Sequence, residues 1–87
     1  MSDELNISVR YFASIREALG AGESLRVPAD STVADLRDAL LARGPEHARV
    51  LARGRAVRIA LNQTLCAETA RLDEAAEVAF FPPVTGG

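Results

Sequence analysis

Hydrophobic and polar residues alternate along several short stretches of the chain. Ile7, Val9 and Tyr11 alternate with their polar neighbours, and a period of two over β-branched residues predicts a half-buried strand over residues 7–12. The same pattern predicts four further strands, over residues 24–27, 57–61, 64–66 and 77–81. Gly20 and Gly22 mark a turn, so we expect the first two strands to pair as a hairpin.

The apolar spacing changes in the middle of the chain. Four apolar residues recur there at the spacing of one helix face: Val33, Leu36, Leu40 and Leu41. Thr32 is a suitable N-cap, and Asp35 completes a capping box with it. Gly44 and Pro45 end the pattern, which therefore predicts one good helix over residues 32–43. A further turn or two of helix would fit residues 46–52.

The resulting order, β-β-α-β-β-β, predicts an α+β fold of the β-grasp or ubiquitin-like type, with a mixed sheet of about five strands. A single main helix covers one sheet face, so the core lies between them. We expect this core to contain Ile7, Val9, Val57, Ile59, Val78 and Phe80, packed against Val33, Leu36 and Leu40. The helical crossover between the first and last strands predicts that these two strands run parallel and adjacent. Residues 1–81 would form this domain and residues 82–87 a flexible tail.

Composition narrows the function classes. The 87 residues are 48% hydrophobic, which fits one packed domain. A net charge of −2 without a basic block argues against a nucleic-acid partner. The polar, acidic start is unlike a signal peptide, and no apolar run is long enough for a membrane span. With a single cysteine, Cys66, these features predict a cytoplasmic protein.

Residue types that carry chemistry are sparse. His47 has no second ligand at metal-binding spacing, so we expect a surface histidine and no metal site. No nucleophile–base set or phosphate loop indicates an autonomous enzyme. Cys66 has no basic neighbour in sequence that would activate it, so we interpret it as a small strand residue. All ten basic residues are arginine, which the codon usage of a GC-rich genome explains; a second interpretation is that an activated C-terminus would meet no side-chain amine on its own molecule.

Two features of the sequence are not explained by the packing of a hydrophobic core. The period of two places Phe12 and Phe81 on the sheet face away from the helix, where Leu65 and Ala79 could join them. An exposed apolar cluster of this kind indicates a partner surface.

The second feature is the tail, which begins beside that cluster. It runs through Pro82, Pro83, Val84, Thr85, Gly86 and Gly87. Six extended residues reach at most about 20 Å. The prolines keep the tail from collapsing, and the two glycines could thread a narrow channel.

Four segments resemble a known family: VRYFASIREALG (9–20), TVADLRDAL (32–40), ALNQTL (60–65) and EVAFFPPVTGG (77–87). Together they are similar to the sulfur-carrier family that includes the small subunit of molybdopterin synthase and the thiamine sulfur carrier, and that is related to ubiquitin. The chain departs from the family pattern at Ala75 and Ala76, where a glycine and an acid are usual. A glycine would ease a turn with positive φ, so the geometry of this loop is left open.

The resemblance implies a chemistry for the tail. A ubiquitin-activating-like adenylyltransferase would consume ATP to form an acyl-adenylate at Gly87. A persulfide donor would convert it to a thiocarboxylate, which enters the large subunit of molybdopterin synthase, a heterotetramer, and gives sulfur to cyclic pyranopterin monophosphate. Gly86 would serve in threading. Contacts to partners would come from Phe12, Leu65, Phe81, Pro82, Pro83, Val84 and Thr85. The chain itself would bind no cofactor and would be a sulfur donor rather than a catalyst.

Three alternatives stay open. The chain could carry sulfur for another pathway, such as a thiamine or protein-bound cysteine route. It could be a ubiquitin-like modifier that forms isopeptide bonds, or a binding module whose tail is never activated. The mass of the cellular protein separates these, because replacing oxygen by sulfur and forming conjugates change it differently.

Overall fold

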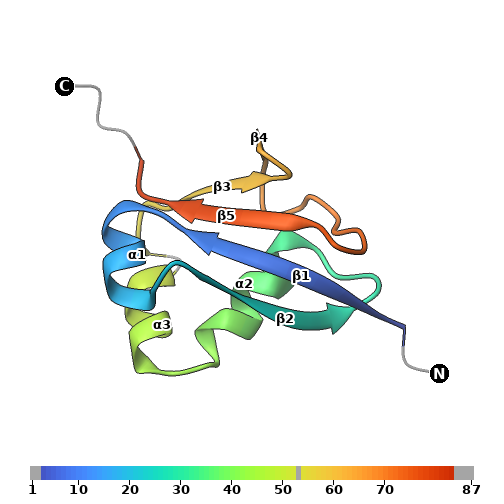
Figure 1. The fold of residues 1–87 in the computed structure, drawn as a ribbon, viewed down its shortest axis with the longest axis horizontal. Coiled ribbons are helices and arrows are strands. Elements are labelled where there is room, and N and C mark those ends of the chain that lie inside the picture. Colours follow the sequence, from blue (N-terminus) through green and yellow to red (C-terminus); the bar gives the residue numbers. More distant parts are fainter. Residues whose placement is uncertain (1–2, 53, 84–87) are drawn as a thin grey trace.

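The computed structural model describes residues 3–52 and 54–83 of the chain. Its elements follow one another along the sequence as β1 (Glu4–Tyr11), α1 (Ala13–Leu19), β2 (Gly22–Pro28), α2 (Val33–Leu41), α3 (Pro45–Leu51), β3 (Arg58–Leu61), β4 (Thr64–Leu65) and β5 (Glu77–Phe81) (Figure 1). All five predicted strands are present, with ends that differ from the predicted ones by up to three residues.

The strands form one mixed sheet in the order β2-β1-β5-β3-β4 (Figure 1). β1 runs parallel to β5, with Tyr11 opposite Phe80, and the other pairs are antiparallel. The predicted β-grasp arrangement, with adjacent parallel first and last strands, is therefore confirmed. This pairing places β5, from which the tail departs, in the centre of the sheet.

The prediction of one main helix is incomplete, because the described residues contain three helices. α2 has the predicted capping box, in which the Asp35 carboxylate accepts from the Thr32 amide at 2.9 Å, but it ends two residues before Arg43. α3 has seven residues, about two turns, and confirms the short helix expected over residues 46–52, with both ends one residue earlier.

The helix α1 was not predicted. Its seven residues bury only Ile15, and Phe12 at its N-cap makes no side-chain capping bond, so its sequence signal is weak. Gly20 ends α1 with a φ of 93°, a conformation that favours glycine. Gly22 begins β2 where a Cβ atom would collide with the Val9 carbonyl oxygen. β1 and β2 still pair as expected, but a helix links them instead of a turn.

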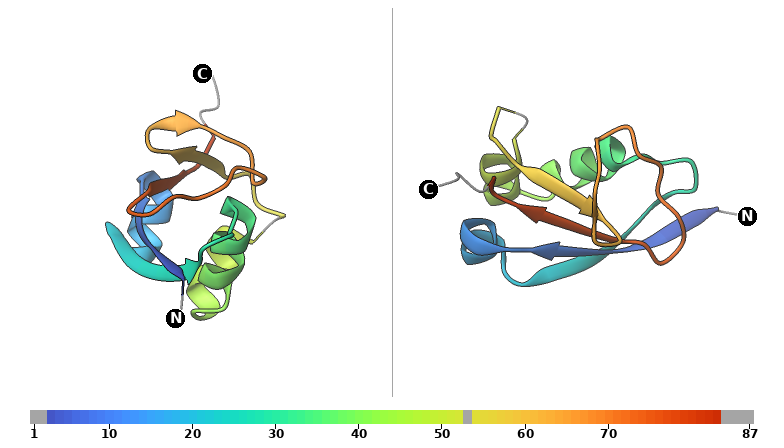
Figure 2. Two further views of the ribbon diagram at one scale, coloured as in Figure 1. Left: turned by 90° about the vertical axis from the view of Figure 1, so that its right-hand side faces the viewer. Right: turned by 90° about the horizontal axis from the view of Figure 1, so that it is seen from above.

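The core lies between the sheet and the helices. α2 and α3 cover one face of the sheet, as the end-on view shows, and α1 adds Ile15 to the same cluster (Figure 2). All nine expected core residues except Val57 are buried; Val57 precedes β3 and is half-buried. Several further residues complete the cluster: Tyr11, Val27, Val50, Leu51, Leu72 and Ala76. Burying each large aliphatic side chain contributes about 1.5–3 kcal/mol, so this cluster is the main source of stability.

A buried arginine fixes α3 against α2. Arg37 lies on α2, and its side chain is only 4% exposed. Its guanidinium donates from Nε to the Leu51 carbonyl at 2.7 Å and from Nη2 to the Ala52 carbonyl at 2.9 Å. The third nitrogen, Nη1, lies 3.4 Å from a Glu68 carboxylate oxygen. The guanidinium therefore donates hydrogen bonds to carbonyls at the C-terminal end of α3, which have no hydrogen-bond partner within the helix.

Candidate functional site

The sheet face opposite the helices carries a row of two alanines and a leucine that ends at an arginine. The strand register places Arg10 opposite Ala79, Ala79 opposite Ala60, and Ala60 opposite Leu65. Side chains at directly paired positions point to the same face of a sheet. This row therefore crosses β1, β5, β3 and β4 on the face that no helix covers.

Two phenylalanines lie two positions beyond Arg10 and Ala79, and therefore on the same face of the sheet. Phe12 follows the pair of Tyr11 and Phe80 and donates its amide to the Phe80 carbonyl at 3.2 Å, which brings it next to Phe81. Phe12 is 38% exposed and Leu65 62% exposed, whereas Phe81 is half-buried. We call Phe12, Ala60, Leu65, Ala79 and Phe81 the open-face patch.

Arginines border the open-face patch. Arg58 pairs with Phe81 across the strands. The Arg10 guanidinium carbon lies 5.7 Å from the centre of the Phe12 ring, within the range of a cation–π interaction, and 3.7 Å separates Arg10 from the Glu77 carboxylate. An apolar centre with a charged rim is the usual composition of a protein-binding surface.

The base of the tail lies at the edge of this patch. Phe81 is the last residue of β5, and the half-buried Pro82 and Pro83 follow it directly. Neither proline has an amide hydrogen to extend the strand, so both end the sheet. The sequence also predicted partner contacts and the tail chemistry for Val84, Thr85, Gly86 and Gly87. These four residues lie outside the described residues.

Among the described residues, Cys66 and the potential metal ligands are the other candidates for chemistry. Cys66 is half-buried, and burial raises the pKa of its thiol, which leaves little reactive thiolate at neutral pH. No three His, Cys, Asp or Glu side chains in residues 3–52 and 54–83 could hold a metal ion together. Across the same residues no helix is long and apolar enough to cross a membrane.

His47 is not the surface residue that the sequence predicted. Its Nε2 atom lies 2.7 Å from the Glu23 carboxylate, which also accepts from the Tyr11 hydroxyl at 2.5 Å and pairs with Arg43 at 2.6 Å. Burial alone would raise the pKa of Glu23, but these three partners outweigh it and lower the pKa. Burial and the Glu23 carboxylate raise the pKa of Tyr11. The cluster joins β1 and β2 to the helical layer, so its role is structural.

Sequence reasoning overlooked Ala60 in the open-face patch. Its parity with Arg58 places it on that face, but a small residue next to a charged one gives no apolar signal. The phenylalanines were found because large aromatic residues rarely stand on an exposed face without a partner.

Comparisons with known proteins place this architecture in a family. The sequence model of the ThiS family matches residues 9–87, from the first strand to the last glycine. The chain belongs to the ThiS family.

Two relatives of this ThiS-family chain are similar over nearly their whole length. The molybdopterin synthase sulfur carrier subunit of Escherichia coli (strain K12) is 43% identical over 82 residues, which cover 93% of this chain and 99% of that protein. The Haemophilus influenzae protein of the same name is 35% identical over the same coverage.

Solved structures of similar proteins share the fold. The HVO 2177 protein of Haloferax volcanii superimposes with a TM-score of 0.78 at 31% identity, covering 97% of this chain and 88% of that chain. The small archaeal modifier protein 1 of the same organism gives 0.74 at 28% identity, covering 92% and 99%. A chain in the complex of subunits 1 and 2 of the molybdopterin-converting factor of Helicobacter pylori gives 0.64 at 26%, covering 95% and 100%.

Proposed function

We propose that this ThiS-family chain is the sulfur-carrier subunit of a molybdopterin synthase and that Gly87 carries the sulfur. The observation that carries the proposal is the 43% identity, nearly from end to end, with the Escherichia coli protein of that name. The open-face patch beside the base of the tail adds support, because a carrier must dock on a partner that supplies the catalytic groups.

The proposed chemistry begins with the weakness of a carboxylate as an electrophile. Attack of the Gly87 carboxylate on the α-phosphate of ATP forms an acyl-adenylate and releases pyrophosphate. The AMP now bonded to the acyl carbon is a good leaving group. The terminal sulfur of a persulfide donor then forms a carbon–sulfur bond as AMP departs. A second thiol breaks the sulfur–sulfur bond, leaving a thiocarboxylate on Gly87 and a disulfide on the donor.

The chain itself would contribute the nucleophile and the docking surface, and it would bind no cofactor. Its thiocarboxylate would enter the large subunit, where two sulfur transfers convert cyclic pyranopterin monophosphate to the dithiolene. A partner of this kind agrees with the Helicobacter pylori complex of the two factor subunits. An adenylyltransferase related to ubiquitin-activating enzymes would supply the ATP chemistry.

Removal of Gly87 tests the proposal. The deletion shortens the tail by about 3.3–3.6 Å. Displacements of even about 1 Å can lower rates about 100-fold, so we expect at least that loss in a molybdopterin synthesis assay with the purified large subunit. An added residue after Gly87 should be equally damaging, because it displaces the reacting group. Affinity for the large subunit should fall far less than activity, since the open-face patch is intact.

The exposed Arg71, which belongs to neither the open-face patch nor the tail, provides a control, and Arg71→Gln should keep full activity. Full activity from a chain without Gly87, or sulfur found on Cys66 by peptide mass analysis, would contradict the mechanism. Failure of the wild-type chain to bind the large subunit would contradict the assignment to this synthase.

A second candidate is a protein modifier, because the small archaeal modifier protein 1 of Haloferax volcanii is similar over 92% of this chain. In that case the activated Gly87 would form an isopeptide bond with a lysine of another protein. Intact mass analysis of the cellular protein separates the two functions. The sulfur carrier predicts a free chain with one oxygen replaced by sulfur, whereas the modifier predicts higher-mass conjugates.

A further inference from the structure

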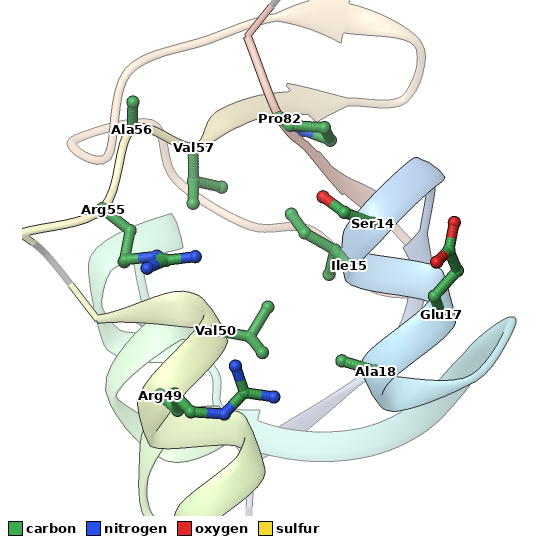
Figure 3. Close-up of a pocket in the computed structure, with 10 residues that line it drawn as sticks. All are labelled: Ser14, Ile15, Glu17, Ala18, Arg49, Val50, Arg55, Ala56, Val57 and Pro82. Atoms are coloured by element: carbon green, nitrogen blue, oxygen red, sulfur yellow. The ribbon is translucent and has the colours of Figure 1, made fainter.

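A second surface feature lies at the base of the tail, on the helical side of the sheet. It is an open pocket of about 320 Å³ between α1, α3 and the segment before β3 (Figure 3). Its apolar walls come from Ile15, Val50, Val57 and Pro82, and Arg49 and Arg55 also line it. We call it the tail-base pocket. Phe81 belongs to the open-face patch and Pro82 to this pocket, so the two surfaces flank the root of the tail.

One of the two arginines of the tail-base pocket has no acidic partner within the described part of the chain. Arg55 has no acidic partner among the residues that the structure describes. Glu46 already holds Arg49 through two hydrogen bonds, to Nε at 3.1 Å and to Nη2 at 2.8 Å, so Arg55 supplies the unpaired charge. Glu17 is the one acidic residue among those lining the pocket. The unpaired charge of Arg55 occurs on a chain whose net charge is −2.

The chemistry of the pocket selects its ligand. A guanidinium beside apolar surface favours a carboxylate, which it can hold with two parallel hydrogen bonds. The volume and the apolar walls would accept an aliphatic side chain next to that carboxylate. We propose that the tail-base pocket binds an acidic segment of the large subunit that receives the tail. This inference rests on the proposed function, because that function supplies the partner.

Two other occupants are less favoured. The chain's own terminal carboxylate is anionic, but Pro82 and Pro83 disfavour a reversal of the chain at the pocket wall, since each fixes φ and the first is followed by a proline. A second copy of the chain could offer its own acidic residues. Both are distinguishable from the large subunit by experiment.

The absence of lysine from the sequence provides a direct test. Arg55→Lys introduces the only side-chain amine in the chain, inside the pocket. A carbodiimide joins an amine to a carboxylate without a spacer, so treatment of this variant with the purified large subunit should form a covalent heterodimer. We expect mass analysis to find the peptide around residue 55 joined to an aspartate or glutamate of the large subunit. The control Arg71→Lys, on an exposed residue paired weakly with Asp30 at 3.9 Å, should form no such link.

Other products would overturn the inference. A link between the residue-55 peptide and the chain's own C-terminal peptide would identify the tail as the occupant. A link between two copies would identify a dimer contact. A complex that forms normally without any link at residue 55 would show that the pocket is empty in it.

Affinity provides a second measurement. The double change Arg49→Gln and Arg55→Gln should weaken binding to the large subunit about tenfold or more and flatten its dependence on salt, because it removes two charges at the interface. Arg71→Gln should leave both unchanged. Equal affinity of the double variant and the control contradicts the pocket proposal alone. If the wild-type chain does not bind the large subunit, the proposed function fails first.

Discussion

Replacement of Arg37 provides the most direct test of how the helical layer is held. The Arg37 guanidinium makes two short hydrogen bonds to the last carbonyls of α3 and contacts Glu68, and its side chain is almost fully buried. Arg37→Ala removes these donors and leaves carbonyls in a site that water reaches poorly. Breaking a buried charged network from one side costs about 3–5 kcal/mol. We therefore expect the free energy of unfolding to fall by about that amount.

This loss is a large part of the total, because a domain of this size is stable by about 5–10 kcal/mol. At about 4–8 °C per kcal/mol for a small domain, Tm should fall by about 12–40 °C. Arg37→Lys should recover only part of the loss, since a single ammonium cannot reproduce the planar fork that reaches both carbonyls.

Urea unfolding followed by far-ultraviolet circular dichroism measures the free energy, with Arg71→Ala as the exposed arginine control. The control should change stability by less than about 0.5 kcal/mol. A loss below about 1 kcal/mol for Arg37→Ala would refute the reasoning, because it would make the buried hydrogen bonds worth no more than an ordinary surface contact. Full recovery by lysine would refute the argument from the fork geometry.

Three further predictions follow from single sites. Phe81→Ala should weaken binding to the large subunit by about 1–3 kcal/mol, measured by calorimetry, while the circular dichroism spectrum stays native; unchanged affinity would remove Phe81 from the interface. Because the folded pKa of Glu23 lies below its ordinary value of 4.5, its contribution to stability is present above that pH and is lost as pH falls through the folded pKa. The unfolding free energy of the wild type should therefore fall more steeply below pH 4.5 than that of Glu23→Gln, and parallel curves would contradict this. Ala75 has a φ of 62°, so Ala75→Gly should relieve about 1–2 kcal/mol of backbone strain. The greater freedom of glycine in the unfolded chain offsets about 0.4–1 kcal/mol, and thermal unfolding should show a small net gain rather than a loss.

The sequence predicted the sheet and α2 because their signals are local. Hydrophobic and polar residues alternate along β1 and β5, which identifies each strand from a few neighbouring residues. The capping box from Thr32 to Asp35 identifies the start of α2 in the same way. α1 gave no comparable signal, since a seven-residue helix with one buried side chain has no repeating apolar stripe. The loop at Ala75 does adopt the positive φ for which the family's usual glycine is suited.

Charged residues explain most of what the sequence could not predict. Arg37 is one helical turn from both Val33 and Leu40, so its position favours burial although its residue type suggests exposure. Its partners, the carbonyls of Leu51 and Ala52, are identified only once α3 is placed. The tail-base pocket is similar, because Arg49, Arg55 and Pro82 come from separate parts of the chain that only the tertiary structure brings together.

The central position of β5 connects the fold to the proposed chemistry. A tail that left an edge strand would have one neighbouring strand at its root, whereas β5 is held by β1 on one side and β3 on the other. Gly87 is six residues beyond Phe81. A small rotation of the docked domain about the root of the tail would therefore displace the terminal carbon, because the displacement grows with distance from the pivot. Docking through the open-face patch on one side and the tail-base pocket on the other would limit that rotation in two directions. A single contact would leave one direction free, and sulfur transfer requires the reacting atoms to be placed within about 1 Å. For this reason we expect variants at either surface to lower the transfer rate even at concentrations of the large subunit that saturate binding.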